Sequence, residues 1–70
     1  MASERQRRGV VAEFDAHKGW GTVVELDGTR WFFQCTRIAN GSRTIDPGTE
    51  VTFRLEARLP GRYEATELLG

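Results

Sequence analysis

A hairpin signal in the middle of the chain is the sequence feature that most restricts the fold. The dipeptide Asp27-Gly28 joins two runs rich in β-branched and aromatic residues, WGTVVEL (20–26) and TRWFFQC (29–35). Asp-Gly readily adopts the positive φ angles of a tight turn whose twist matches that of two paired strands. The sequence therefore predicts an antiparallel strand pair across residues 20–35.

Three more segments have the same short, β-rich character: residues 10–14, 50–59 and 62–69. In the second of them, Val51, Phe53 and Leu55 alternate with polar residues, which is the pattern of a strand with one buried face. Turn residues separate the segments, and no stretch of ten residues has helical periodicity. Five short strands in a chain of 70 residues predict an all-β fold, a small five-stranded antiparallel barrel whose closure leaves no exposed edge.

One domain accounts for nearly the whole chain. Residues 1–8 are polar and without pattern, so we expect a flexible N-terminal arm before a barrel that spans residues 9–70. The long connection 36–49 carries Ile38 and Ile45, which we expect to anchor it in the core. A domain of this size buries only ~60% of the surface of its unfolded chain, so any binding site is expected on an outer face rather than in a deep cleft.

The charges of the chain balance. Ten Lys and Arg residues are matched by ten Asp and Glu residues, and the net charge is zero. Neutrality argues against strong sequence-independent attraction to nucleic acid, which usually leaves a basic surface. The single cysteine, Cys35, suits a reducing compartment, and no run approaches the ~18 apolar residues of a membrane span. We expect a cytoplasmic monomer without membrane contact.

Strand periodicity assigns the outward side chains of the first hairpin strand. If Val23 points inward, Trp20 and Thr22 point outward, because successive strand residues alternate between the two faces. Gly19 and Gly21 keep the surface beside the tryptophan low. Trp20 is therefore expected to be mostly exposed.

The second hairpin strand offers two possible faces to the core. Trp31 and Phe33 form the more apolar set, so we expect them inside and Trp31 mostly buried. This choice leaves Arg30, Phe32 and Gln34 outside, next to the outward tryptophan of the neighbouring strand. Outward aromatic rings with cations nearby form a platform on which nucleic-acid bases stack.

Together these segments resemble the bacterial cold-shock domain. The resemblance runs from Gly9 to Leu68 and is carried by GVVAEFDAHKGWGTV, RWFFQCTRI, DPGTEVTF and YEATEL. The family's first aromatic motif, Lys-Gly-Phe-Gly-Phe-Ile, reads Lys-Gly-Trp-Gly-Thr-Val at 18–23. Its second motif, Val-Phe-Val-His-Phe, reads Trp-Phe-Phe-Gln-Cys at 31–35. The resemblance implies a five-stranded barrel of the oligonucleotide-binding (OB) type that binds single-stranded RNA or DNA.

Several positions of the family platform hold other residues in this chain. Ala12 and Glu13 stand where the family has Lys and Trp, and Thr22 replaces the second ring of the first motif. Gln34 and Cys35 replace a His and a Phe. The resemblance therefore implies a reduced platform of four residues: Phe14, Lys18, Trp20 and Phe32. Each lost stack removes ~1–3 kcal/mol of binding energy, so weak binding is expected.

Further candidates for nucleic-acid contact are polar or lie near the ends of strands: Gln34, Arg30, Arg43, Arg62 and Tyr63. The amide of Gln34 both donates to and accepts from a base edge. The arginines are able to stack their planar guanidinium groups on bases, and Arg43 stands where the family has another Phe. Two aromatic residues have an alternative role, in which Phe14 closes one end of the barrel and Tyr63 packs at the last hairpin.

The sequence thus predicts weak, low-specificity binding of single-stranded RNA or DNA, similar to the action of an RNA chaperone that keeps strands unpaired. The alternative is a cold-shock-like fold that no longer binds nucleic acid and acts as a protein-interaction module. Zero net charge, the acidic residue Glu13 and the missing rings favour this alternative. No residue combination is typical of a catalytic, metal or cofactor site, so we expect no enzyme activity, metal or cofactor.

Overall fold

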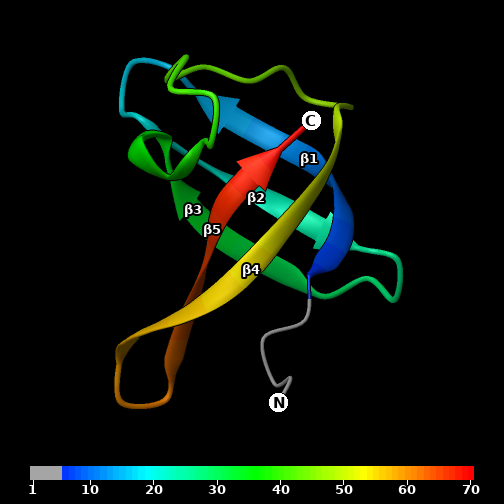
Figure 1. Cartoon of the computed structure of the whole chain (residues 1–70), viewed down its shortest axis with the longest axis vertical. Helices are drawn as coiled ribbons and strands as arrows, with labels where there is room; N and C mark the ends of the chain where they lie inside the picture. Colours follow the sequence, from blue (N-terminus) through cyan, green and yellow to red (C-terminus); the bar gives the residue numbers. More distant parts are fainter. Residues whose placement is uncertain (1–5) are drawn as a thin grey trace.

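The computed structural model describes residues 6–70, apart from the side chain at position 59, and it confirms the predicted all-β class (Figure 1). Five antiparallel strands form one sheet in the order β3-β2-β1-β4-β5. The strands are β1 (Arg7–Asp15), β2 (Trp20–Glu25), β3 (Arg30–Gln34), β4 (Glu50–Leu59) and β5 (Arg62–Leu69). The only helical element in the described part is the short 3-10 helix η1 (Cys35–Arg37), directly after β3. Among residues 6–70, no helix has the length and apolar character needed to span a membrane.

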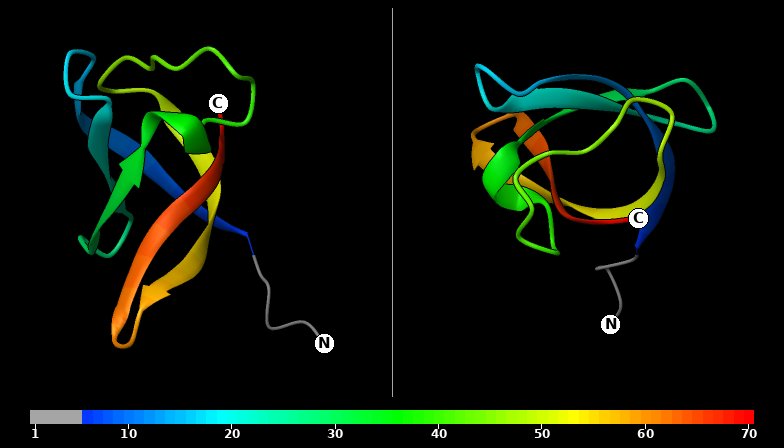
Figure 2. Two further views of the ribbon diagram at one scale, coloured as in Figure 1. Left: turned by 90° about the vertical axis from the view of Figure 1, so that its left-hand side faces the viewer. Right: turned by 90° about the horizontal axis from the view of Figure 1, so that it is seen from above.

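The sheet curls around one core, with the β4–β5 hairpin on one side and β1, β2 and β3 on the other (Figure 2). β3 and β5 are the two ends of the strand order and share no strand ladder. A parallel bridge between Ile38 and Leu68 joins the chain after η1 to β5, and the Ala39 amide donates to the Leu68 carbonyl at 2.7 Å. The fold is the predicted small OB-type barrel, but its closure is incomplete, because β3 ends after five residues and η1 follows in place of a ladder.

Every strand contributes to the buried core. Its eight apolar side chains are Val11, Val23, Phe33, Ile38, Val51, Phe53, Ala65 and Leu68. Ile38 is 5% exposed, and Ile45 packs half-buried against the same cluster. Both predicted anchors of the long connection are therefore confirmed.

Two β-bulges change which side chains face inward. In β1 the pairing with β2 shifts between Val11 and Glu13, so that Glu13 is exposed while Phe14 packs against the core. In β5 the bulge lies around Glu67, whose φ is 55°. Strict alternation along β5 would turn Leu68 outward, and the extra residue keeps it in the core.

The first strand begins at Arg7, although residues 1–8 were expected to form a flexible arm. The Arg7 guanidinium donates to both carboxylate oxygens of Glu25, at 3.1 and 2.9 Å, and its central carbon lies 5.9 Å from the centre of the Trp31 ring. The indole N–H of Trp31 donates to the same carboxylate at 2.9 Å. This cluster ties the start of β1 to the barrel. Of the expected arm, residues 1–5 lie outside the described residues.

The β2–β3 pair forms the predicted hairpin, but of the two residues Asp27 and Gly28 only the glycine has a positive φ angle. Gly28 has a φ of 94°, which glycine adopts without a steric penalty. The Thr29 amide donates to the side chain of Asp27 at 2.9 Å. Because this hydrogen bond stabilises the ionised carboxylate, the pKa of Asp27 is lower than its ordinary value.

Gly21 allows β1 and β2 to approach each other closely. It pairs with Phe14 on one side and with Phe33 on the other. A Cβ atom at this position would overlap the carbonyl oxygen of Glu13 and would lie 3.0 Å from the Cζ atom of Phe33. Lack of space, rather than a positive φ angle, is therefore the reason for glycine here.

Replacing Gly21 by Ala is expected to lower the free energy of unfolding by about 3 kcal/mol, because the new methyl group forces β1 or the Phe33 ring to move. The matched control is Gly61→Ala, where φ is +78° and no atom lies within 4 Å of a Cβ. The control is expected to cost about 1 kcal/mol through the left-handed backbone alone. Urea unfolding followed by circular dichroism measures both, and equal losses would contradict the close approach at Gly21.

Candidate nucleic-acid interface

Trp20 and Phe32 form a pair of rings across the β2–β3 ladder, called the aromatic pair below. Their ring centroids are 5.2 Å apart and their planes are inclined by 35°. The two residues are diagonal neighbours in the register, on one face of the sheet. That face is the outer one, because Val23 and Phe33, which point to the opposite face, are fully buried. The faces predicted for both rings are thus confirmed.

The extent to which the two tryptophan side chains are buried differs from the prediction. Trp20 is half-buried rather than mostly exposed, because Phe32 covers part of its ring. Trp31 is also half-buried, although it was expected to be mostly buried: it packs against the core while its indole N–H reaches the carboxylate of Glu25. Alternation along a strand assigns the face of a side chain, but neighbouring side chains decide how much of it is covered.

An Asp-capped turn places Lys18 next to the aromatic pair. The Oδ1 atom of Asp15 accepts hydrogen bonds from the amides of His17 and Lys18, both at 3.0 Å. The Gly19 amide donates to the Asp15 carbonyl at 2.7 Å, and the Gly19 carbonyl accepts from the Cys35 amide at 2.8 Å. Lys18 is exposed at this turn. Asp15 was absent from the predicted site residues, although an Asp before a short polar stretch that ends in Gly is typical of such a turn.

A shallow hollow of about 500 Å³ lies between this turn and β1. Lys18, Trp20 and Phe14 line it together with the acidic residues Glu13 and Asp15. Lys18 is the one cation among the described residues that line the hollow. A phosphate placed here would be attracted by one charge and repelled by two, so the charges that line the hollow do not by themselves favour an anion.

Phe14 lies on the core side of β1, the face opposite to that of the aromatic pair. Its ring stacks on Phe33, with centroids 5.9 Å apart and 9° between the ring planes. The side chain is half-buried and packs against the core cluster. This packing agrees with the alternative considered from the sequence, in which Phe14 closes one end of the barrel, and its remaining surface borders the hollow.

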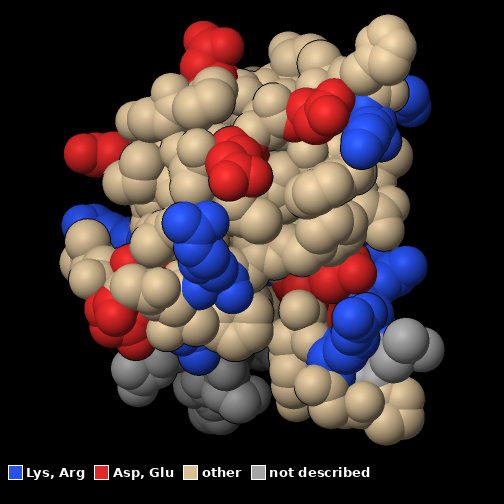
Figure 3. Space-filling model, turned by 180° about the vertical axis from the view of Figure 1, so that it is seen from behind, with Lys and Arg blue, Asp and Glu red and all other residues tan. Residues whose placement is uncertain are grey.

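The outer face of β1, β2 and β3 mixes aromatic and acidic residues. The register places them in two rows across the three strands: Glu13, Thr22 and Phe32 in one, and Asp15, Trp20 and Gln34 in the other. Gln34 is half-buried directly opposite Trp20 in the β2–β3 register. The hydroxyl oxygen of Thr22 is buried and has no hydrogen-bond partner among residues 6–70. Figure 3, which views this side of the molecule, shows basic and acidic residues interspersed around uncharged surface rather than one basic patch.

The remaining candidate residues lie in different parts of the molecule. Arg30 is exposed at the start of β3, two residues before Phe32 and on the same face. Arg43 is exposed in the long connection, with a φ of 65°. Arg62 and Tyr63 are exposed at the tip of the β4–β5 hairpin, at the opposite end of the molecule from the β1–β2 turn (Figure 1). The structure therefore gathers five of the candidates around β2 and β3: Lys18, Trp20, Arg30, Phe32 and Gln34.

Comparison with known proteins identifies no relative: no protein-family model matches the chain, and no curated protein matches it. Within residues 6–70, no three His, Cys, Asp or Glu side chains are grouped so that they could hold a metal ion. The functional assignment therefore depends on the aromatic pair and its surroundings.

Removing Phe32 is expected to expose Trp20. The chain has two tryptophans, so a Trp31→Phe background leaves Trp20 as the single fluorophore. In that background, Phe32→Ala should increase acrylamide quenching and shift the emission to longer wavelength, because the ring that covers Trp20 is lost. Tyr63→Ala, at the distant hairpin tip, is the control. Unchanged quenching in a folded Phe32→Ala variant would disprove the contact between the two rings.

Proposed function

We propose that this protein binds single-stranded RNA or DNA, weakly and with little sequence preference, by stacking bases on Trp20 and Phe32. The observation that carries the proposal is the position of this aromatic pair, on the outer face of β2 and β3 beside the exposed Lys18. Every base has a flat face that stacks on an aromatic ring, so such a surface binds without reading sequence. Two stacks supply ~2–6 kcal/mol, which corresponds to dissociation constants on the order of tens of micromolar or weaker.

The resemblance to the cold-shock domain supports the same proposal. Its two motifs, at 18–23 and 31–35, are placed so that one begins in the β1–β2 turn and continues through β2 while the other follows β3. We propose that the chain is a cold-shock-like domain of the cytoplasm and that it keeps RNA strands unpaired, because a base stacked on protein is not available for pairing.

The outward carboxylates favour a second candidate function. Glu13 and Asp15 lie on the same face as the aromatic pair, and the net charge of the chain is zero. An aromatic surface with acidic neighbours suits a protein partner with basic side chains better than it suits a phosphate backbone. A folded protein that binds neither RNA nor DNA at low salt would exclude the first proposal and favour this protein-interaction module.

Trp20→Ala and Phe32→Ala are each expected to weaken binding of a pyrimidine-rich single strand by at least about fivefold, through the loss of one stack. Both variants should leave the salt dependence of binding nearly unchanged, because neither removes a charge. Fluorescence anisotropy of a labelled oligonucleotide at low salt measures the affinity, and Tyr63→Ala is the control with another exposed ring. Full affinity in both folded variants would place the binding site elsewhere.

Lys18→Ala is expected to weaken binding to all single strands alike. Loss of one phosphate contact releases one counterion fewer, so the slope of the logarithm of the association constant against the logarithm of salt concentration should fall in magnitude by ~0.7. Arg62→Ala, which removes an exposed charge at the far hairpin tip, should leave the slope unchanged. Equal effects of the two variants would mean that Lys18 acts only through net charge.

A further inference from the structure

Most of the exposed apolar side chains in the described part of the chain lie around one hollow. Four large apolar residues are exposed among residues 6–70. Three of them line a hollow of about 570 Å³ over β1 and β4: Val10 at 36%, Leu26 at 88% and Leu69 at 52% exposure. The fourth, Tyr63, lies on the distant hairpin tip. Three exposed apolar side chains gathered at one place suggest a contact surface more strongly than three scattered ones would.

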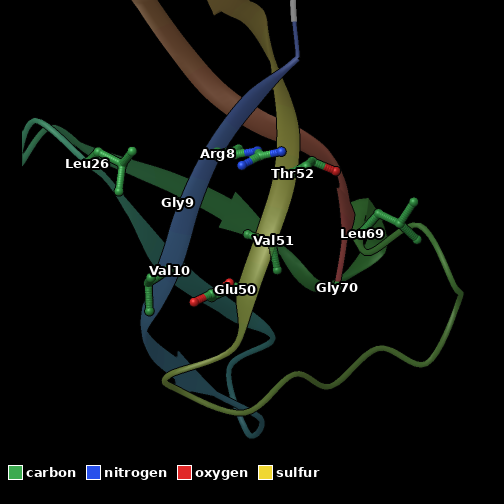
Figure 4. Close-up of a pocket in the computed structure, with 9 residues that line it drawn as sticks. All are labelled: Arg8, Gly9, Val10, Leu26, Glu50, Val51, Thr52, Leu69 and Gly70. Atoms are coloured by element: carbon green, nitrogen blue, oxygen red, sulfur yellow. The ribbon is translucent and has the colours of Figure 1, made fainter.

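The register explains how these side chains come together (Figure 4). β1 pairs with β4 so that Arg8 lies opposite Thr52 and Val10 lies opposite Glu50. The residues between them on both strands are buried, so these four side chains all face outward. The turn after β2 and the end of β5 add Leu26 and Leu69 at the two sides. We call this surface the β1–β4 patch: Arg8, Val10, Leu26, Glu50, Thr52 and Leu69.

The two charged residues of the β1–β4 patch have opposite signs and lie on different strands and in different rows. Several arginines in the described residues form ion pairs with glutamates of the same chain: Arg7, Arg37, Arg54 and Arg58. Arg8 and Glu50 form no such pair within residues 6–70. A two-fold axis that brings Arg8 of one chain to Glu50 of a second chain also brings Glu50 of the first to Arg8 of the second. The patch is therefore complementary to itself in charge.

We propose that the β1–β4 patch binds the same patch of a second copy of this chain and forms a symmetric dimer. Val10, Leu26 and Leu69 contribute the apolar part of the contact, and Arg8 and Glu50 form two equivalent ion pairs around it. The patch is small compared with the surfaces of stable dimers, so the association is weak and reversible. Trp20 and Phe32 do not line the patch, and the dimer does not depend on nucleic-acid binding. A reversible dimer is the alternative to the monomer expected from the sequence.

Sedimentation velocity over a series of protein concentrations tests the proposal, with charge reversal as the probe. Arg8→Glu and Glu50→Arg should each weaken self-association at least about tenfold, because each places like charges opposite one another. Mixing the two single variants in equal amounts should restore association, since both ion pairs form again across the mixed interface. Leu26→Glu should also abolish the dimer, and Tyr63→Glu is the matched control that leaves it intact.

The variants should keep the thermal unfolding midpoint of the parent when measured as dilute monomers, because the substituted side chains are exposed. A protein that sediments as a monomer at every concentration would overturn the proposal. A dimer that is insensitive to both charge reversals would place the contact on another surface. The proposal would also be overturned if the full chain stays monomeric and only a variant without residues 1–5 forms a dimer, since that segment would then be the occupant of the patch.

Discussion

The close approach of β1 and β2 at Gly21 is the constraint on which the rest of the structure depends. Without a side chain at this position, the Glu13 carbonyl and the Phe33 ring both occupy the space that a Cβ would need. Phe14 can then stack on Phe33 from the core side, and the bulge in β1 turns Glu13 outward. One missing methyl group thus links the packing at the end of the barrel to the chemistry of its outer face.

That outer face carries aromatic rings, which suit stacked bases, and carboxylates, which repel phosphate. Trp20 and Phe32 provide the flat apolar surface on which we propose that bases stack, and the Asp15-capped turn holds Lys18 beside them. The same cap brings a carboxylate into the hollow, where Glu13 adds a second. The stabilisation of the turn and the repulsion of phosphate therefore come from the same residue, and the balance between them limits the affinity that such a face can reach.

The two candidate contact surfaces differ in how far they were predictable. The common face of Trp20 and Phe32 follows from alternation within one hairpin, and the structure confirms it. The β1–β4 patch draws Val10, Leu26 and Leu69 from three separate parts of the chain, so no local pattern marks it. These side chains become neighbours only through strand pairing between segments that are distant in the sequence.

The sequence by itself determined the all-β class, the five strand positions and the inward direction of Phe33. These features depend on turn residues and on alternation between neighbours, which are local properties. Only the tertiary structure decided that Phe14 packs inside and that the seam between β3 and β5 stays open. A bulge shifts the alternation by one residue, and whether it forms is decided by how closely two strands can pack, which depends on side chains far apart in the sequence.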